Sequence, residues 1–135
     1  WEAYSSATAL ARMTREKLAE TPDTVMWELV GGDINKASAR TPFAAMKQGD
    51  KAGKEVVDKY ISYLACGITN IINIFQPNVL CIGGGVANEG HYLLDPVIEI
   101  AERDQFTAGC ELKTKICIAE LGNDAGIIGA ALLGE

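Results

Sequence analysis

A four-residue apolar run that ends in three glycines is the feature that most constrains the fold of this chain. The run occupies residues 79–82, and Gly83, Gly84 and Gly85 follow it directly. A wholly apolar segment of this length with a glycine stop is typical of a strand buried in a parallel sheet. A second, less regular run at 115–119 predicts another strand. Long helical patterns separate the two, which indicates an α/β domain with a mostly parallel sheet.

The longest helical pattern begins after Asp50 and ends before Pro77. Its apolar residues recur every three or four positions, as on one face of a helix. They are Val57, Tyr60 or Ile61, Leu64, Ile68, Ile71 and Phe75, with Ala65 and Ile72 widening the stripe. Shorter helical patterns cover residues 2–18, 25–30, 43–48, 95–106 and 125–133. Phe106 is expected on the inner side of its helix.

Start and stop signals divide these helices. Thr21 before Pro22 predicts a cap followed by a first helical turn, and Thr41 before Pro42 repeats that signal. Gly49 closes the helix that precedes Asp50. Two strands do not make a stable sheet, so the domain is expected to take further strands from elsewhere.

Length and charge exclude several classes of protein. The chain has 135 residues, which is one domain or part of one. It begins at Trp1, so we expect that something upstream has been removed. Twelve basic against eighteen acidic residues give a net charge of −6, which argues against a broad nucleic-acid surface. No signal peptide and no apolar stretch of the ~18 residues needed to span a bilayer are visible.

The four cysteines form no metal-binding pattern. None of Cys66, Cys81, Cys110 and Cys117 belongs to a C-x-x-C pair, and their spacings fit no common zinc template. Cys81 and Cys117 lie in apolar runs, and Cys66 lies in a helical pattern. The cysteines are therefore expected to be reduced, buried thiols of a cytoplasmic protein.

The glycine turn after the first strand allows two interpretations. Glycines leave backbone N–H groups uncovered, so a planar base or a phosphate can approach the main chain closely. The alternative is a tight strand-to-helix turn without a ligand. Asn88 stands where a dinucleotide fingerprint requires its last glycine, and no P-loop motif occurs.

Six further residues have plain structural interpretations. Gly126, Gly129 and Ala130 predict a close helix contact, and Asp124 is better explained as a residue that caps this helix than as a general base. Glu2 alone indicates only a solvated helix acid. His91 is the one histidine, is expected in a surface loop, and shows no sign of a nucleophile pair.

Taken together and in order, several stretches resemble the C-terminal half of ROK sugar kinases, in particular the glucokinase type. They are Glu2–Ser6, Gly49-Asp50, Gly83–Gly85 and Gly122–Ala131. The resemblance implies the two-lobed actin-like ATPase fold, also described as ribonuclease H-like. Residues 1–135 would form its C-terminal lobe, an α/β unit with a mixed sheet and long packing helices.

The resemblance also assigns roles to residues. Glu2 matches a glutamate that hydrogen-bonds hydroxyls of the bound sugar, and Gly83, Gly84 and Gly85 match the adenosine motif. The phosphate loop, the catalytic aspartate and the ligands of a structural zinc are expected upstream of Trp1. Residues 123–125 imitate the sequence around the family's catalytic aspartate but do not correspond to it.

The implied function is ATP-dependent phosphorylation of a hexose, with glucose the first candidate and glucose 6-phosphate the product. The implied cofactors are ATP and Mg²⁺, and a cytoplasmic homodimer is expected, without nucleic-acid or membrane partners. The 135 residues alone are expected to be inactive. The alternative is the ligand-binding part of a sugar-responsive transcriptional repressor of the same family, whose DNA-binding segment would lie upstream.

Overall fold

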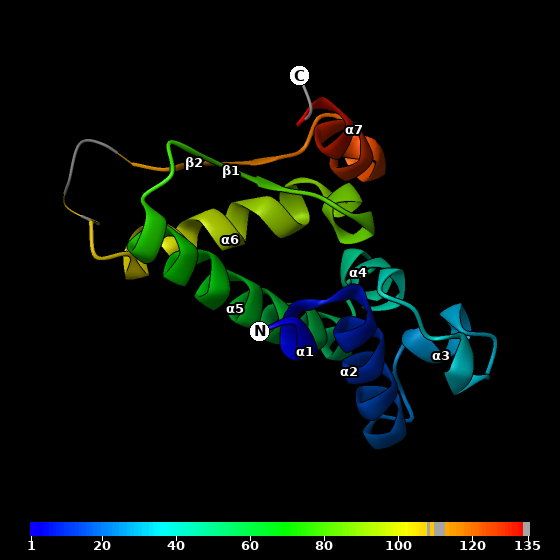
Figure 1. Cartoon of the computed structure of the whole chain (residues 1–135). Coiled ribbons are helices and arrows are strands. Elements are labelled where there is room, and N and C mark those ends of the chain that lie inside the picture. The colour runs from blue at the N-terminus through cyan, green and yellow to red at the C-terminus, as the bar shows by residue number, and fades with distance from the viewer. Residues whose placement is uncertain (108, 110–112, 134–135) are drawn as a thin grey trace. The chain divides into compact units, whose positions relative to one another are not determined.

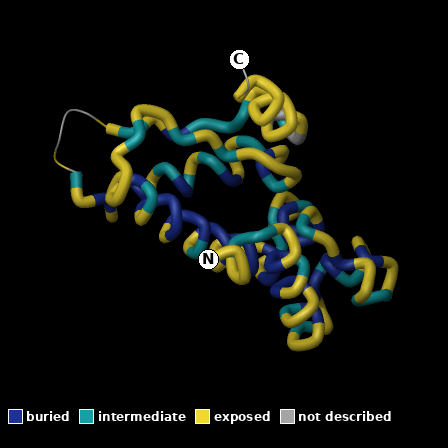
Figure 2. Tube along the Cα trace, in the orientation of Figure 1, coloured by how far each residue is buried: buried dark blue, intermediate teal, exposed yellow. Residues whose placement is uncertain are grey.

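The computed structural model describes residues 1–107, 109 and 113–133. The chain forms two compact units, Trp1–Gly67 and Ile68–Glu135. Helix α5, Lys51–Phe75, begins in the first unit and ends in the second (Figure 1). Its buried face recurs every three or four residues, as the sequence predicts, and is followed easily in Figure 2. Phe75 is the exception: it is 73% exposed, because the last turn of α5 extends past the packed part of the helix.

Short helices make up the rest of the first unit. They are α1 Glu2–Ser5, α2 Ala7–Glu20, α3 Met26–Leu29, the 3₁₀ helix η1 Ile34–Lys36 and α4 Arg40–Lys47. A core of buried side chains joins the segments from α2 to the start of α5: Leu18, Met26, Val30, Ala37, Ala45 and Ala52, flanked by Val25, Trp27 and Ile34. Apolar burial of this kind is the main favourable term in folding.

The single helix predicted over residues 2–18 is wrong, because the chain breaks at Ser6. Ser6 is extended, with ψ 164°, and its hydroxyl accepts a hydrogen bond from the Ala9 N–H at 3.1 Å. A serine side chain commonly satisfies a free N–H at the start of a helix in this way. Ser6 therefore ends α1 and caps α2.

The start predicted at Thr21 is also misplaced. Thr21 ends α2, and its carbonyl accepts a hydrogen bond from the Trp27 indole at 3.1 Å. The hydroxyl of Thr24 instead accepts from the Met26 N–H at 3.2 Å and so stands at the start of α3. The start signal at Thr41 is nearly right, since α4 begins at Arg40.

Asp50 opens the long helix, as predicted. Its carboxylate accepts hydrogen bonds from the Gly53 N–H at 2.6 Å, the Val25 N–H at 3.0 Å and the Thr24 hydroxyl at 2.9 Å. The same side chain thus satisfies the first turn of α5 and fastens it to the segment that begins α3. Gly53 sits so close to α4 that an added Cβ would lie 2.8 Å from the Ala45 Cβ.

The second unit contains a parallel strand pair, as predicted. Strands β1, Val79–Ile82, and β2, Lys115–Ile118, are hydrogen-bonded in parallel, with Val79 opposite Lys115. The other elements are the 3₁₀ helices η2 Gly85–Glu89 and η3 Gly122–Asp124 and the helices α6 His91–Asp104 and α7 Ala125–Leu132. Helix α6 contacts the sheet through β2 (Figure 1). Within the described residues the sheet has these two strands alone.

The expectation of a fully buried strand is wrong for this chain. Residues of β1 alternate between exposed and half-buried, and Val79 is 51% exposed. Helix α6 covers one face of the pair, where Ile116 is buried. The other face has no comparable cover among the described residues, so every second side chain reaches solvent.

Helix α6 differs from the prediction at both ends. It begins at His91 rather than Asp95, so Pro96 lies inside the helix and His91 is not a loop residue. It ends at Asp104, and Phe106, expected on the inner side, is 90% exposed beyond that end.

The prediction of buried thiols also fails. Cys66 and Cys81 are exposed, and Cys117 is half-buried. Cys110 lies outside the described residues. In the part of the chain that the structure describes, no helix combines the length and the apolar character that a membrane crossing requires.

Candidate functional site

The glycine turn predicted as a ligand site lies at the end of β1 and is open to solvent. Gly83, Gly84 and Gly85 are all exposed. Gly84 has φ +88°, a backbone conformation that a residue with a side chain adopts only with strain. A Cβ added at Gly84 or Gly85 would meet no atom within 4 Å. The backbone on this side of the turn can therefore be reached by a ligand.

Both strands end at this turn. The carbonyl of Ile82 accepts a hydrogen bond from the Ala119 N–H at 2.9 Å, which continues the pairing just past β2. The 3₁₀ helices that follow the two strands, η2 and η3, contact one another. Ligands of open α/β sheets bind beyond the carboxyl ends of the strands. The position of the turn is thus the usual one for a binding site.

Glu2 lies in the other unit, in the first turn of α1, and its side chain is exposed. A helix of four residues has little stability of its own. Hydrogen bonds to α5 hold it in place: the Trp1 indole donates to the Tyr63 carbonyl at 2.9 Å, and the Tyr60 hydroxyl donates to the Ser5 carbonyl at 2.9 Å. Burial raises the pKa of Tyr60 to about 12, so this hydroxyl stays a donor.

Ring packing completes the attachment of α1. The rings of Tyr4 and Tyr63 lie 5.1 Å apart, centre to centre. The Trp1 indole covers Gly67, where an added Cβ would fall 1.9 Å from a ring carbon. The sequence points to Tyr4 only as part of the Glu2–Ser6 stretch, and it does not point to Tyr63 or Gly67. A glycine in the interior of a helix lowers helix stability by about 1 kcal/mol relative to alanine. Its presence at position 67 is therefore the sequence signal that could have indicated a close contact there.

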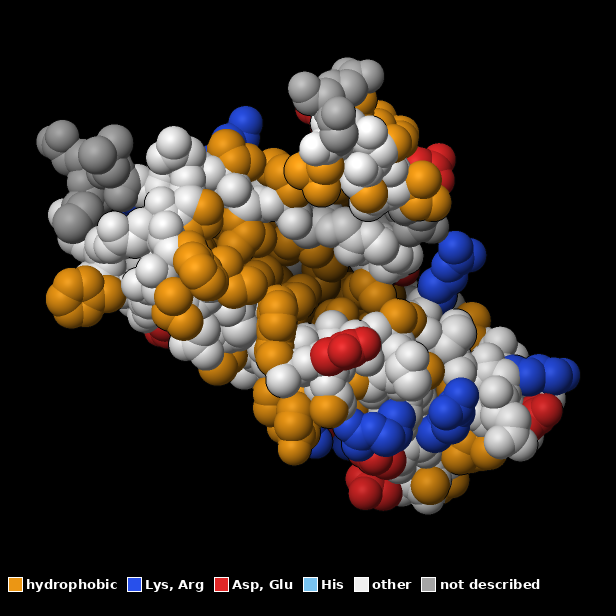
Figure 3. Space-filling model, viewed as in Figure 1, with side chains coloured by type: hydrophobic (Ala, Val, Ile, Leu, Met, Phe, Trp, Pro, Cys, Tyr) orange, Lys and Arg blue, Asp and Glu red, His pale blue; other side chains and the backbone are white. Residues whose placement is uncertain are grey.

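Asp124 lies directly before α7, but its side chain makes no capping hydrogen bond, so the predicted cap is wrong in that respect. The predicted helix contact at Gly126 and Gly129 is also not found among the described residues, because an added Cβ at either position would meet none of their atoms within 4 Å. Helix α7 instead exposes apolar side chains, among them Ile127 at 74% (Figure 3). The rings of His91 and Tyr92 lie 4.1 Å apart at the start of α6.

The resemblance implies two metals, Mg²⁺ and a structural Zn²⁺. Throughout residues 1–107, 109 and 113–133, no three His, Cys, Asp or Glu side chains are grouped so that they could hold a metal ion. These residues therefore hold no structural zinc site of the usual four-ligand kind.

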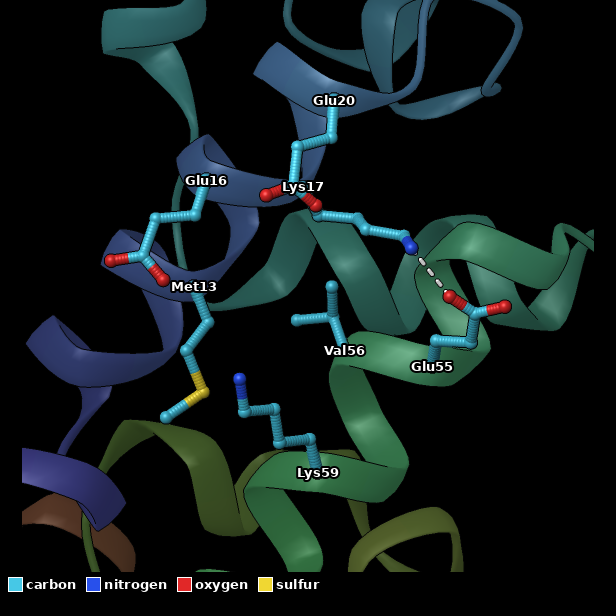
Figure 4. A pocket seen from close by; sticks show the side chains of 7 residues that line it. All are labelled: Met13, Glu16, Lys17, Glu20, Glu55, Val56 and Lys59. Carbon is cyan, nitrogen blue, oxygen red and sulfur yellow. Dashed lines mark hydrogen bonds and ion pairs between the residues drawn. The ribbon is translucent and has the colours of Figure 1, made fainter.

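Two hollows lie away from the candidate residues. One, of about 180 Å³, lies between α2 and α5 in the first unit (Figure 4). Its lining contains acidic and basic side chains. Lys17 forms an ion pair with Glu55 at 2.5 Å, and Lys59 and Glu16 also line the hollow. The other, of about 450 Å³, includes Asn78 and Thr114 and so lies at the amino ends of the strands. Neither hollow includes Glu2 or the glycine turn.

Comparison with known proteins identifies the family of this chain. The sequence profile of the ROK family matches residues 1–135. The chain belongs to the ROK family. A glucokinase of Thermotoga maritima is 33% identical over 130 residues, which are 96% of this chain and 40% of the relative. The ROK chain thus spans about two fifths of the length of the curated relatives that it matches.

Solved structures of ROK proteins share its fold. A ROK family glucokinase from Streptomyces griseus, in complex with glucose and AMPPNP, matches 98% of this chain and 43% of its own, with a TM-score of 0.85 and 29% identity. A ROK family transcriptional regulator, a homolog of the E. coli MLC protein, matches 98% of this chain and 32% of its own, with a TM-score of 0.71 and 23% identity. The fold is therefore the α/β, actin-like ATPase fold expected from the sequence.

Proposed function

We propose that residues 1–135 form the C-terminal lobe of an ATP-dependent hexose kinase, with glucose as the first candidate substrate. The observation that carries the proposal is the exposed Gly83–Gly85 turn at the carboxyl ends of two parallel strands, in a chain of this family. The glucokinase relatives and the glucose and AMPPNP complex of the S. griseus enzyme support the same reaction.

In this proposal the glycine turn receives the adenosine part of ATP. Gly84 gives the turn its left-handed backbone, and Gly85 presents main chain with no side chain above it. A flat base can then lie against the peptide groups at van der Waals distance. A side chain at either position would stand where the ligand has to lie. ATP supplies the phosphoryl group, and these glycines hold its adenosine part in place.

Glu2 orients the sugar in the same proposal. A carboxylate accepts hydrogen bonds only, so it suits a pair of sugar hydroxyl groups. Its segment is fixed to α5 by the contacts of Trp1, Tyr4 and Ser5. This fixation spares much of the entropy that a mobile glutamate would lose on binding. The base that deprotonates the sugar, the phosphate loop and the zinc ligands would belong to a preceding part of the protein.

A sugar-responsive regulator is the second candidate, since a ROK transcriptional regulator shares the fold. Nucleotide binding separates the two proposals: the kinase requires it, whereas a regulator that senses sugar does not. A homodimer and a cytoplasmic location remain predictions for either protein.

The deciding experiment measures nucleotide binding by this chain. Calorimetric titration with AMPPNP is expected to show binding that Gly85→Ala weakens at least tenfold, because a methyl group enters the space of the ligand. Gly85 does not have positive φ, so alanine there causes no backbone strain. Gly109→Ala is the matched control, with equally open space and no positive φ, and should bind like the unsubstituted chain. Equal affinity of all three proteins, or no binding at all, contradicts the nucleotide role.

A further inference from the structure

Two cysteines face each other across the strand pair. Cys81 of β1 and Cys117 of β2 are direct partners in the parallel register, and their sulfur atoms lie 3.5 Å apart. The sequence separates them by 36 positions, so only the register brings them together. No zinc template and no C-x-x-C motif predicted this pair.

The pair lies on the accessible face of the sheet. Side chains alternate along a strand, so Cys81 and Cys117 point away from the face on which Ile116 is buried. Cys81 is exposed and Cys117 is half-buried. A small oxidant can therefore reach Cys81 in this chain.

The two sulfurs are not equivalent. The hydrogen bond with Cys81 raises the pKa of the Cys117 thiol, and partial burial raises it further. Either thiol can donate in this contact, and Cys81 is the more exposed of the two. The more accessible thiol, Cys81, is the one expected to react first with an electrophile.

The backbone permits a bond between them. Adjacent strands lie roughly 4.8 Å apart, within the range of roughly 4.4–6.8 Å found between the Cα atoms of disulfides. The sulfurs have to close from 3.5 Å to about 2.05 Å, the length of an S–S bond. Rotation of the two side chains and a small shift of a strand can supply this movement, since β1 is covered on one face only.

We propose that Cys81 and Cys117 form a peroxide-sensitive dithiol that closes into an intramolecular disulfide. The Cys81 thiolate attacks hydrogen peroxide, the O–O bond breaks, and Cys81 becomes a sulfenic acid as hydroxide leaves. The sulfur of Cys117 then attacks the Cys81 sulfur and the S–O bond breaks. The leaving hydroxyl group takes up the proton of the Cys117 thiol and departs as water. In total, two thiols and one peroxide give one disulfide and two waters. The inference does not depend on the proposed kinase function.

The test uses a background that leaves only this pair, Cys66→Ser/Cys110→Ser. After stoichiometric peroxide, intact-mass measurement is expected to show a monomer that has lost two hydrogens and takes up no iodoacetamide. Adding Cys81→Ser to the same background is the matched control and should leave Cys117 without a partner. A doubly alkylated protein after peroxide, or disulfide-linked dimers alone, overturns the proposal.

A second measurement uses the unsubstituted chain and so does not depend on the folding of the variants. Chymotryptic mapping after peroxide, with cleavage after Phe75 separating Cys66 from Cys81, should find the peptide of Cys81 joined to that of Cys117 and not to that of Cys66. Phenylarsine oxide, whose arsenic bonds two thiols with release of water, should bind the reduced chain at one equivalent and the oxidised chain not at all. Arsenical binding that survives in Cys81→Ser would show that this pair is not the dithiol, and the proposal fails.

Discussion

At Gly67 a missing side chain makes room for an indole ring. A Cβ there would lie 1.9 Å from a carbon of Trp1, so the glycine and the tryptophan occupy one shared space. At Gly84 the reason for glycine is different, because φ +88° excludes most side chains while the space around it is open. The first glycine is a packing requirement, and the second is a backbone requirement at an accessible turn.

Gly67→Ala should therefore destabilise the protein although alanine favours helices. Displacing Trp1 costs about 1–3 kcal/mol as overpacking, against a helix gain of about 1 kcal/mol. We expect a net loss on the order of 1 kcal/mol in urea unfolding, with quenched or shifted Trp1 fluorescence. Gly126→Ala in α7, where a Cβ meets nothing within 4 Å, is the matched control and should be neutral or stabilising. Equal effects of the two substitutions would exclude the shared space.

Glu2→Ala tests the sugar role in the longer protein of which we propose this chain to be a part. Loss of hydrogen bonds that the sugar hydroxyls donate to a charged acceptor costs about 1.5–3 kcal/mol, so the sugar KM should rise roughly 10- to 100-fold while the ATP KM changes little. Glu28→Ala, another exposed acid in the first turn of a short helix, is the control. A sugar KM that both substitutions change equally, or that neither changes, removes Glu2 from the site.

At the scale of elements, α5 depends on Asp50, the residue directly before it. Burial alone would raise the pKa of Asp50, but hydrogen bonds from Gly53, Val25 and Thr24 outweigh that effect and lower it. One carboxylate thereby stabilises the start of the longest helix and its contact with the segment before α3.

Asp50→Asn should lower stability at neutral pH by about 1 kcal/mol, because the amide oxygen can still cap the helix but lacks the charge that strengthens these hydrogen bonds and favours a helix N-terminus. Because the folded-state pKa lies below the unfolded value, the carboxylate stabilises the fold above pH ~4, and this contribution disappears as pH falls through the folded pKa. Urea unfolding at several pH values should therefore show a smaller difference between the two proteins at pH ~3 than at pH ~7. A difference that is constant across this range contradicts the lowered pKa.

Long elements were predicted more accurately than their boundaries. The periodicity of α5 extends over seven turns, and the β1 run ends in glycines, so both were located correctly. The break at Ser6 and the start of α6 at His91 depend on single hydrogen bonds and turns that compete with helix continuation. Sequence periodicity carries no information about such local competition.

The candidate site was predicted in the same uneven way. The glycine turn could be located because its residues are consecutive. The support of Glu2 by Tyr60, Tyr63 and Gly67, and the pairing of Cys81 with Cys117, arise from contacts between distant segments. The burial of β1 also differs from the prediction, because one face of the strand pair has no cover among the described residues. Each of these needs the register of the folded chain.

At the scale of the whole molecule, this chain covers about two fifths of its curated relatives, 40% of the T. maritima glucokinase. Phosphoryl transfer needs groups that position the phosphates and a base, and the described residues provide no metal-binding group of three. We expect no glucose-dependent ATP turnover by the 135 residues in a coupled assay, even at high protein concentration. The AMPPNP titration is the control that the chain is folded. Glucose-dependent turnover by the 135 residues that Glu2→Ala abolishes would contradict this prediction.

The contact between Trp1 and Gly67 also imposes an order on folding during protein synthesis. A ribosome makes the chain from its amino end, so Trp1 emerges long before the position that it covers. Until the middle of α5 has left the ribosome, α1 has no surface to pack on and a four-residue helix cannot persist alone. The segment that carries Glu2 therefore waits, exposed and unstructured, while some sixty later residues are added.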